Sequence, residues 1–219
     1  MNKITEAQII ETQSSQFIQP YSVKFVQNGN TRVWDLIKVH NSVVIVIFNI
    51  TRKVLVLVKQ FRPGVYINSI PEEDRTGSID VTKYPAELGV TLEFCAGIVD
   101  KNKSLAEIAR EEVLEECGYD VPVEKLEKIQ TFRSGVGSAG DKQTLFFVEV
   151  TDDMKVNSGG GVDEELIEVV EMGLEEAREY LAQEEVRSPS GFLFAMHWFL
   201  AAKAGQYVWR EKNKTTRIF

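Results

Sequence analysis

Residues 97–119 read GIVDKNKSLAEIAREEVLEECGY, and this stretch predicts a loop that leads into a helix starting near Ser104. Glu112, Glu115 and Glu116 are spaced i, i+3 and i+4, which places three carboxylates on one face of that helix. Like charges at this spacing repel each other, so a positive group should offset them. Mg²⁺ prefers oxygen ligands and commonly binds one or two carboxylates together with substrate phosphates. The stretch therefore indicates a Mg²⁺-dependent enzyme that acts on a phosphate compound.

Both ends of this helix carry sequence signals. Ser104 fits the N-cap position, and Glu107 three residues later completes a capping box. Gly118 fits the position just beyond the helix, where a left-handed backbone conformation is common. Apolar residues at every fourth position form a row beside the carboxylates: Leu105, Ala109, Val113 and Cys117. We therefore expect a helix that buries one side and presents its carboxylates next to it.

The rest of the chain predicts a mixed sheet covered by helices. Residues 21–26 and 31–39 flank Asn28-Gly29, a strong signal for a hairpin turn. The β-branched runs 43–48 and 54–58 predict a second hairpin. Further strands are expected at 90–94, 125–131, 144–150 and 166–170, helices at 174–183 and 191–204, and a long irregular stretch at 67–89.

Length and charge restrict the class of protein. A chain of 219 residues can bury the core of one larger domain, or of one domain with an extension. The net charge of −8 argues against nucleic-acid binding, whereas metal ions could still supply positive charge to a phosphate substrate. Residues 1–16 do not resemble a secretory signal, and the longest clean apolar run, 43–48, is too short to span a membrane. The apolar run 192–202 contains His197 and Trp198 and predicts a core helix. We expect a cytoplasmic protein without a membrane segment, with Cys95 and Cys117 reduced.

The spacing of glycines and glutamates in 97–119 resembles the Nudix box, a loop–helix–loop unit whose glutamates bind Mg²⁺ for hydrolysis of a nucleoside diphosphate linked to another group. The matching positions are Gly97, Glu112, Glu115, Glu116, Gly118 and Tyr119. The resemblance implies a metal shell, with Mn²⁺ as a substitute for Mg²⁺, formed by the carboxylates of Glu112, Glu115 and Glu116 and the carbonyl oxygen of Ala96.

Two positions depart from the family pattern. The family usually has a glutamate six residues after the first glycine, where this chain has Lys103. It also usually has an arginine directly before the first metal-binding glutamate, where this chain has Glu111. Arg110 lies one residue earlier, about 100° around the helix, so it cannot simply replace that arginine. These departures favour an alternative of another class, a nucleotide-sugar binding module that has lost catalysis.

Further segments resemble the ADP-sugar and UDP-sugar pyrophosphatase branch of the family, and within it the UDP-glucose pyrophosphatases of animals. These segments are 27–29, 57–63, 93–97, 134–137 and 165–169, and the resemblance runs from about residue 20 to residue 200. It implies an α/β fold: a Nudix α/β/α sandwich with a mixed sheet. An N-terminal antiparallel β extension at residues 1–40 would precede the hydrolase domain at residues 41–219. In related enzymes the extension packs across a two-fold axis, so a homodimer is expected.

The implied reaction is Mg²⁺-dependent hydrolysis of a nucleotide sugar, with UDP-glucose giving UMP and glucose 1-phosphate. The alternative enzyme is an ADP-ribose pyrophosphatase giving AMP and ribose 5-phosphate, because the Nudix box cannot separate the two. The resemblance also implies that an acid on loop 159–165 completes the active site. Glu165 is the first choice, followed by Glu164 and Asp163, with Glu115 as a further catalytic candidate. The glycines at 159–161 are expected to act as a hinge for this loop.

Substrate contacts are expected from three regions. Arg62 has a planar fork that matches phosphate oxygens, and Glu93 lies just before the box. The glycines of the loop 134–137 would let backbone N–H groups approach the substrate closely. Trp34, in the extension, would reach the active site of the second copy. The expected substrate-binding residues are therefore Arg62, Glu93, Trp34, Ser134, Gly135 and Gly137.

Overall fold

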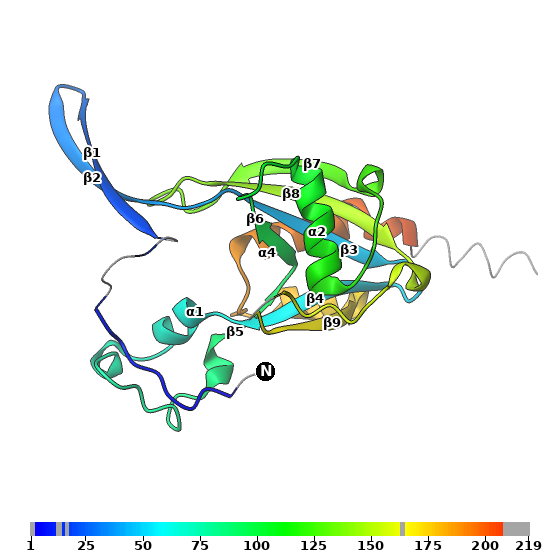
Figure 1. Ribbon diagram of the computed structural model, residues 1–219, viewed down its shortest axis with the longest axis horizontal. Coiled ribbons are helices and arrows are strands. Elements are labelled where there is room, and N and C mark those ends of the chain that lie inside the picture. Colours follow the sequence, from blue (N-terminus) through cyan, green and yellow to red (C-terminus); the bar gives the residue numbers. More distant parts are fainter. Residues whose placement is uncertain (1–2, 12–14, 16–17, 163–164, 208–219) are drawn as a thin grey trace, which may run out of the picture.

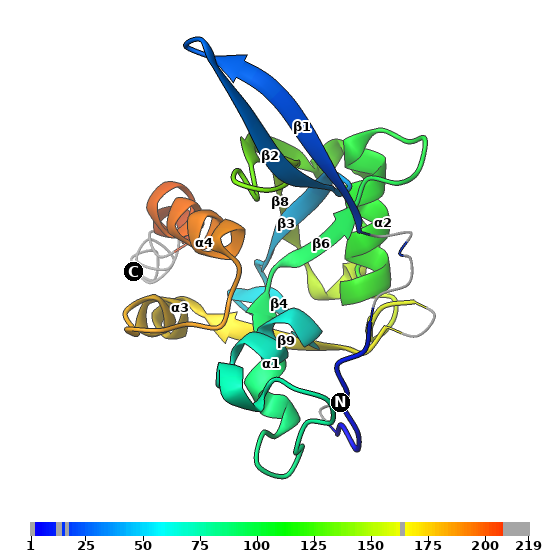
Figure 2. The same cartoon turned by 90° about the vertical axis from the view of Figure 1, so that its left-hand side faces the viewer.

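The computed structural model describes residues 3–11, 15, 18–162 and 165–207. Its body has three layers, in which helices cover both faces of a mixed β-sheet, and a two-stranded hairpin projects from one end (Figures 1 and 2). The predicted α/β/α sandwich with a mixed sheet and a separate antiparallel β extension is therefore confirmed.

The main sheet contains seven strands: β3 (Ser42–Asn49), β4 (Val54–Phe61), β5 (Val90–Glu93), β6 (Cys95–Ile98), β7 (Glu127–Arg133), β8 (Lys142–Val150) and β9 (Ile167–Gly173). β3 and β8 run parallel along their whole length, and the other neighbours are antiparallel. The strands expected between residues 43 and 170 are all present, with ends that differ by a few residues.

The sheet opens between its two central strands. β3 and β4 pair through residues 47–49 and 54–56 and then separate. Beyond that point, residues 42–45 of β3 pair with β6, and residues 58–61 of β4 pair with β5. Because β5 and β6 follow each other in the chain, they bridge the two halves of the sheet. The opening this leaves is the place where the candidate active site lies.

The two faces of the sheet are buried by different helices (Figure 2). α2 (Leu105–Cys117) packs on one face, and α3 (Leu174–Leu181) and α4 (Ser190–Ala202) belong to the opposite layer. Alternate residues of a strand point to opposite faces, so Val43 and Ile45 face α2 whereas Val44 and Val46 face the other layer. Burial on both sides explains why β3 is an unbroken apolar run.

α2 begins and ends where the sequence predicts. The Ser104 side chain accepts a hydrogen bond from the Glu107 N–H, and the Glu107 carboxylate accepts one from the Ser104 N–H, so the capping box is complete. Gly118 ends the helix with a φ of 75°, the left-handed conformation that glycine adopts without a steric penalty. Ala109, Val113 and Cys117 of the predicted apolar row are buried.

The N-terminal hairpin consists of β1 (Gln19–Gln27) and β2 (Asn30–Lys38). Asn28 and Gly29 form its turn with φ values of 53° and 79°, as the Asn-Gly signal predicts. Every residue of β1 is exposed. Contacts with the body lie in the second half of β2, where the Ile37 N–H donates to the Ser138 carbonyl at 2.9 Å.

The stretch after β4 is more regular than expected, because α1 (Pro63–Asn68) begins it and short 3-10 helices occupy Glu72–Asp74 and Ala86–Gly89. Residues near the N-terminus pack on it: the Ile9 N–H donates to the Gly77 carbonyl and the Ile79 N–H donates to the Ala7 carbonyl. The remaining 3-10 helices are Val123–Lys125 and Asp152–Met154. No helix in the described part of the chain combines the length and the apolar character needed to cross a membrane.

Candidate active site

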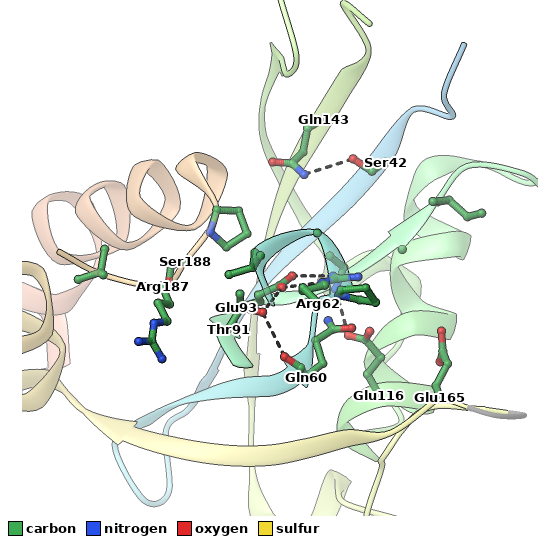
Figure 3. Close-up of a pocket in the computed structure, with 18 of the residues that line it drawn as sticks. Ser42, Gln60, Arg62, Thr91, Glu93, Glu116, Gln143, Glu165, Arg187 and Ser188 are labelled. Carbon is green, nitrogen blue, oxygen red and sulfur yellow. Dashed lines mark hydrogen bonds and ion pairs between the residues drawn. The ribbon is translucent and has the colours of Figure 1, made fainter. Parts of the chain in front are cut away.

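A pocket of about 1050 Å³ lies where β3 and β4 separate (Figure 3). Strands β3 to β6, helix α2, the loop before β9 and the loop between α3 and α4 all contribute to its wall. Six of the predicted site residues line it: Arg62, Glu93, Ala96, Glu112, Glu116 and Glu165. The fold therefore brings together residues that are up to about a hundred positions apart in the sequence.

Glu112 and Glu116 lie one helical turn apart on α2 and both reach the pocket. A Cβ atom on Gly97 would lie 2.0 Å from Glu112 Oε1, so a glycine is needed for the Glu112 side chain to lie against β6. Glu116 is buried, and its Oε2 accepts a hydrogen bond of 3.0 Å from the Ala96 N–H. This explains the spacing between the first glycine and the glutamates of the box.

The pKa values of these two carboxyl groups lie well above the usual range. Burial is the main cause for both groups, and it raises the pKa of Glu112 to about 7 and that of Glu116 to about 8. Repulsion from Glu115 adds to the shift at Glu112, and repulsion from Glu112 adds to it at Glu116. Within the described residues, neither carboxylate forms an ion pair. The site thus concentrates poorly solvated negative charge that a bound cation would offset.

The oxygen atoms at this position suit a hard divalent cation as ligands. Glu112, Glu116 and the backbone of Ala96 line the same pocket, and carboxylate and carbonyl oxygens are the ligands that Mg²⁺ prefers. Glu115 does not line the pocket, although its charge acts on Glu112. Among the residues whose positions are described, no three His, Cys, Asp or Glu side chains form a ready-made metal cluster. The predicted ligand set therefore stays a prediction, and the residues present fit it.

Arg62 is held in the pocket wall by Glu93. Its Nε donates to Glu93 Oε1 at 2.8 Å, and one of its terminal nitrogens donates to Glu93 Oε2 at 2.7 Å (Figure 3). The guanidinium group thus binds both oxygens of the Glu93 carboxylate. Glu93 is buried and also accepts a 2.6 Å hydrogen bond from the Thr91 hydroxyl. The hydrogen bonds to Glu93 raise the pKa of Arg62, which keeps the guanidinium charged. Arg62 thus presents a fixed positive group to the pocket.

Glu165 lies on the same side of the pocket as Glu116 (Figure 3). Its carboxylate accepts a hydrogen bond of 3.2 Å from the Val162 N–H within its own loop. The other two predicted loop acids, Asp163 and Glu164, lie outside the described residues. Glu165 is therefore the loop acid that the structure places at the pocket.

The remaining predicted substrate residues form a separate unit. The Trp34 indole N–H donates to the Gly137 carbonyl at 2.9 Å, which links the hairpin to the loop 134–140. In that loop, Ser134 donates its N–H to Asp141 and Gly135 has a φ of 48°. Trp34, Ser134, Gly135 and Gly137 do not line the pocket of their own chain. Their contacts with substrate stay a prediction.

Lys103 and Glu111, the two residues that depart from the family pattern, contact each other. Lys103 forms an ion pair with Glu111, and Lys101 joins the same carboxylate at 3.3 Å. These lysines lower the pKa of Glu111, chiefly through the hydrogen bond from Lys103. Arg110 pairs with Asp120 at 2.7 Å instead. The lysines and Glu111 therefore tie the loop before α2 to the helix itself.

Several pocket residues were not predicted from the sequence. Gln143 donates to the Ser42 hydroxyl at 3.2 Å on the far side of the pocket from Glu116 (Figure 3). A Cβ atom on Gly191 would lie 2.1 Å from Gln143 Oε1, and this glycine at the start of an apolar helix is the one sequence signal for that contact. Arg187 lies on a polar connection between helices, where no local pattern marks it.

Comparison with known proteins identifies the family. No protein-family model matches the chain. The uridine diphosphate glucose pyrophosphatase NUDT14 of Bos taurus is 38% identical over 217 residues, which cover 93% of this chain and 97% of that protein. The protein of the same name from Mus musculus is 38% identical over 200 residues, or 85% of this chain and 90% of that protein. A GDP-mannose pyrophosphatase of Cronobacter sakazakii is 31% identical over 157 residues, or 72% of each chain.

A solved structure of an ADP compounds hydrolase has the same fold. It superposes with a TM-score of 0.63 at 18% sequence identity, covering 93% of this chain and 94% of the other. The chain therefore belongs to the Nudix sugar pyrophosphatases, as its sequence pattern predicts. The predicted enzyme class, a hydrolase of phosphorus-containing anhydrides, is likewise confirmed.

Proposed function

We propose that this protein hydrolyses UDP-glucose to UMP and glucose 1-phosphate in a Mg²⁺-dependent reaction. The observation that carries the proposal is the single pocket in which the buried carboxylates of α2 and the fixed guanidinium of Arg62 meet. The choice of UDP-glucose follows the names of the relatives from Bos taurus and Mus musculus, which match the chain over most of its length.

The residues of the pocket would bind the metal ion, bind the phosphate groups and transfer a proton. Glu112, Glu116 and the Ala96 carbonyl would hold Mg²⁺, or Mn²⁺ in its place, with Glu115 as a further ligand or positioning group. The bound cation supplies positive charge against the pyrophosphate. The Arg62 guanidinium uses two of its five N–H donors on Glu93, no other described residue accepts from this group, and the remaining three donors would bind phosphate oxygens. Glu165 is the candidate that would move a proton during attack by water.

The geometry favours an enzyme over a binding module that has lost catalysis. Lys103 and Glu111 were the features that suggested lost catalysis, and they form an ion pair with each other outside the pocket lining. The pocket retains the features that the proposed catalysis would need, namely buried carboxylates, an arginine that would bind phosphate and an acid on a neighbouring loop.

The test is hydrolysis of UDP-glucose by the purified protein with Mg²⁺ and with EDTA, beside ADP-ribose and GDP-mannose at the same concentrations. Mg²⁺-dependent release of UMP and glucose 1-phosphate, faster than cleavage of the other two, is the expected result. Faster cleavage of ADP-ribose to AMP and ribose 5-phosphate would replace the proposal by the alternative enzyme. Binding of UDP-glucose without any turnover would favour the binding module.

We also propose that residues 1–40 serve as a dimerisation extension of the hydrolase domain at 41–219. The support is the exposed hairpin, whose strands have no partner layer among the described residues. In a dimer, Trp34 and the loop 134–137 of one copy would reach the pocket of the other. The cytoplasmic location and the lack of a nucleic-acid partner stay predictions.

A further inference from the structure

Three consecutive glycines precede the loop acid Glu165. Gly159, Gly160 and Gly161 have φ values of 69°, 116° and 87°, so all three adopt backbone conformations that L-residues rarely occupy. A run of three such glycines fixes an unusual chain path at this position. The contacts of the run explain what that path achieves.

The glycine run caps the C-terminal end of α2. The Gly160 N–H donates to the Glu116 carbonyl at 2.9 Å, and the Gly161 N–H donates to the Glu115 carbonyl at 3.1 Å. Carbonyl groups in the last turn of a helix have no hydrogen-bond partner within the helix. The run therefore completes the helix at the two residues whose side chains belong to the predicted metal site.

Close approach to α2 requires glycine at the first position. A Cβ atom on Gly159 would lie 2.2 Å from the Glu116 carbonyl oxygen, which is backbone and cannot move aside cheaply. At Gly160 the situation differs, since the nearest atom to an added Cβ would be 3.6 Å away. A substitution at Gly160 would therefore disturb the backbone path without a steric clash.

The other end of the run holds Glu165. The Gly160 carbonyl accepts a hydrogen bond from the Ile167 N–H at 3.3 Å, so the loop closes onto the start of β9. The Glu165 N–H donates to the Val162 carbonyl at 3.1 Å, and a Cβ atom on Gly161 would lie 2.7 Å from Glu165 Oε2. One short segment thus contacts the backbone of Glu116 on one side and the side chain of Glu165 on the other.

We propose that Gly159–Gly161 is a positioning segment that fixes the carboxylate of Glu165 relative to the carboxylates of α2. The inference rests on the proposed function, because it concerns the same site. It differs from the hinge expected from the sequence, since the hydrogen bonds to α2 anchor the run instead of leaving it free to swing. The glycines act through Glu165 and do not touch substrate themselves.

The decisive variant is Gly160→Ala, assayed with whichever of UDP-glucose, ADP-ribose and GDP-mannose the wild-type protein cleaves fastest. We expect kcat to fall by about tenfold or more, since a misplaced catalytic group costs rate, while KM changes by less than about threefold. Gly77→Ala is the control, because Gly77 also has a positive φ, of 57°, and open space around it but is not part of the pocket lining. An unchanged kcat in Gly160→Ala would overturn the proposal.

A double-mutant cycle separates positioning from a general loss of stability. If Gly160 acts through Glu165, then adding Gly160→Ala to Glu165→Gln lowers kcat by less than about twofold further. An equal loss in both backgrounds would show that the glycine acts independently of Glu165 and would overturn the proposal. Full activity of Glu165→Gln alone would do the same.

Hydrogen exchange tests the anchor without any substrate. The amides of Gly160 and Gly161 should be protected in the wild-type protein, and Gly160→Ala should abolish the protection of Gly161. Exchange of these amides at the rate of an open loop would contradict the positioning role. Protected amides in a protein that cleaves none of the three nucleotides would count against the proposed function alone.

Discussion

At the scale of single residues, Glu116 combines burial with charge. Because its pKa is raised to about 8, the negative form is destabilised in the metal-free protein, and a cation would offset that cost. We expect Glu116→Gln to fold normally, since the amide oxygen can still accept the hydrogen bond from Ala96. Loss of a group that supports a metal ligand typically costs 10- to 100-fold, so loss of the ligand itself should lower kcat by at least about a hundredfold. Steady-state kinetics with Mg²⁺ measure this, and wild-type turnover would remove Glu116 from the mechanism.

The second prediction at this scale concerns the ion pair between Lys103 and Glu111. Their ion pair suggests that the charges of two family positions have been exchanged, which preserves attraction between the loop and α2. Glu111→Lys alone should lower the melting temperature by a few degrees, because three positive groups would then lie together, including Lys101. The double variant Lys103→Glu/Glu111→Lys should recover most of that loss. Thermal unfolding of the wild-type protein, Glu111→Lys, Lys103→Glu and the double variant checks it, and losses that simply add in the double variant would show that the pair contributes nothing.

At the scale of elements, the packing of β6 against α2 depends on Gly97. An added methyl group would meet the end of the Glu112 side chain, which is flexible enough to shift but belongs to the predicted metal site. We expect Gly97→Ala to lower kcat by about 10- to 100-fold, because about 1 Å of displacement has effects of this size. Its melting temperature should stay close to that of Gly205→Ala, a control glycine with open space around it. A large loss of stability with normal kcat per folded molecule would contradict this reasoning.

The elements that could be predicted are those with strong local signals. α2 has a capping box at Ser104 and a left-handed glycine at Gly118, and the first hairpin has an Asn-Gly turn, so all of these are visible in the sequence. The break between β5 and β6 was not predicted, because the chain changes its partner from β4 to β3 there and no local pattern encodes that exchange. Arg187 was missed for the same reason, since its place in the pocket comes from tertiary packing.

At the scale of the whole molecule, the metal site should couple stability to pH. In metal-free protein the folded-state pKa values of Glu112 and Glu116, about 7 and about 8, exceed the ordinary value of 4.5 expected in the unfolded chain. Between these values the folded state binds more protons, so its stability falls as the pH rises. We expect the melting temperature in EDTA to fall from pH 6 to pH 8 and Mg²⁺ to restore it at pH 8. The double variant Glu112→Gln/Glu116→Gln should show a flatter pH profile; an equally steep one would mean that other groups cause the change.

The last prediction concerns the hairpin, because among the described residues the apolar side chains of Val23, Phe25 and Trp34 on one of its faces stay exposed. Directly opposite residues of an antiparallel pair share a face, which places Val23 beside Trp34 and Phe25 beside Arg32. An isolated two-stranded hairpin is marginally stable in water, so a long exposed one needs a partner, and a second copy would cover the same face on both chains. Light scattering at micromolar concentration should give twice the chain mass of 24.8 kDa.

A matched pair of variants identifies the face. Val23→Glu should give a monomer, because it buries a charge at the proposed contact. Val26→Glu introduces the same change on the opposite face, where the side chain is 70% exposed, and should leave the dimer intact. If Trp34 of one copy completes the pocket of the other, the Val23→Glu monomer should also lose turnover. A wild-type protein that has the mass of one chain would contradict the dimer, and full turnover by the Val23→Glu monomer would confine the active site to a single chain.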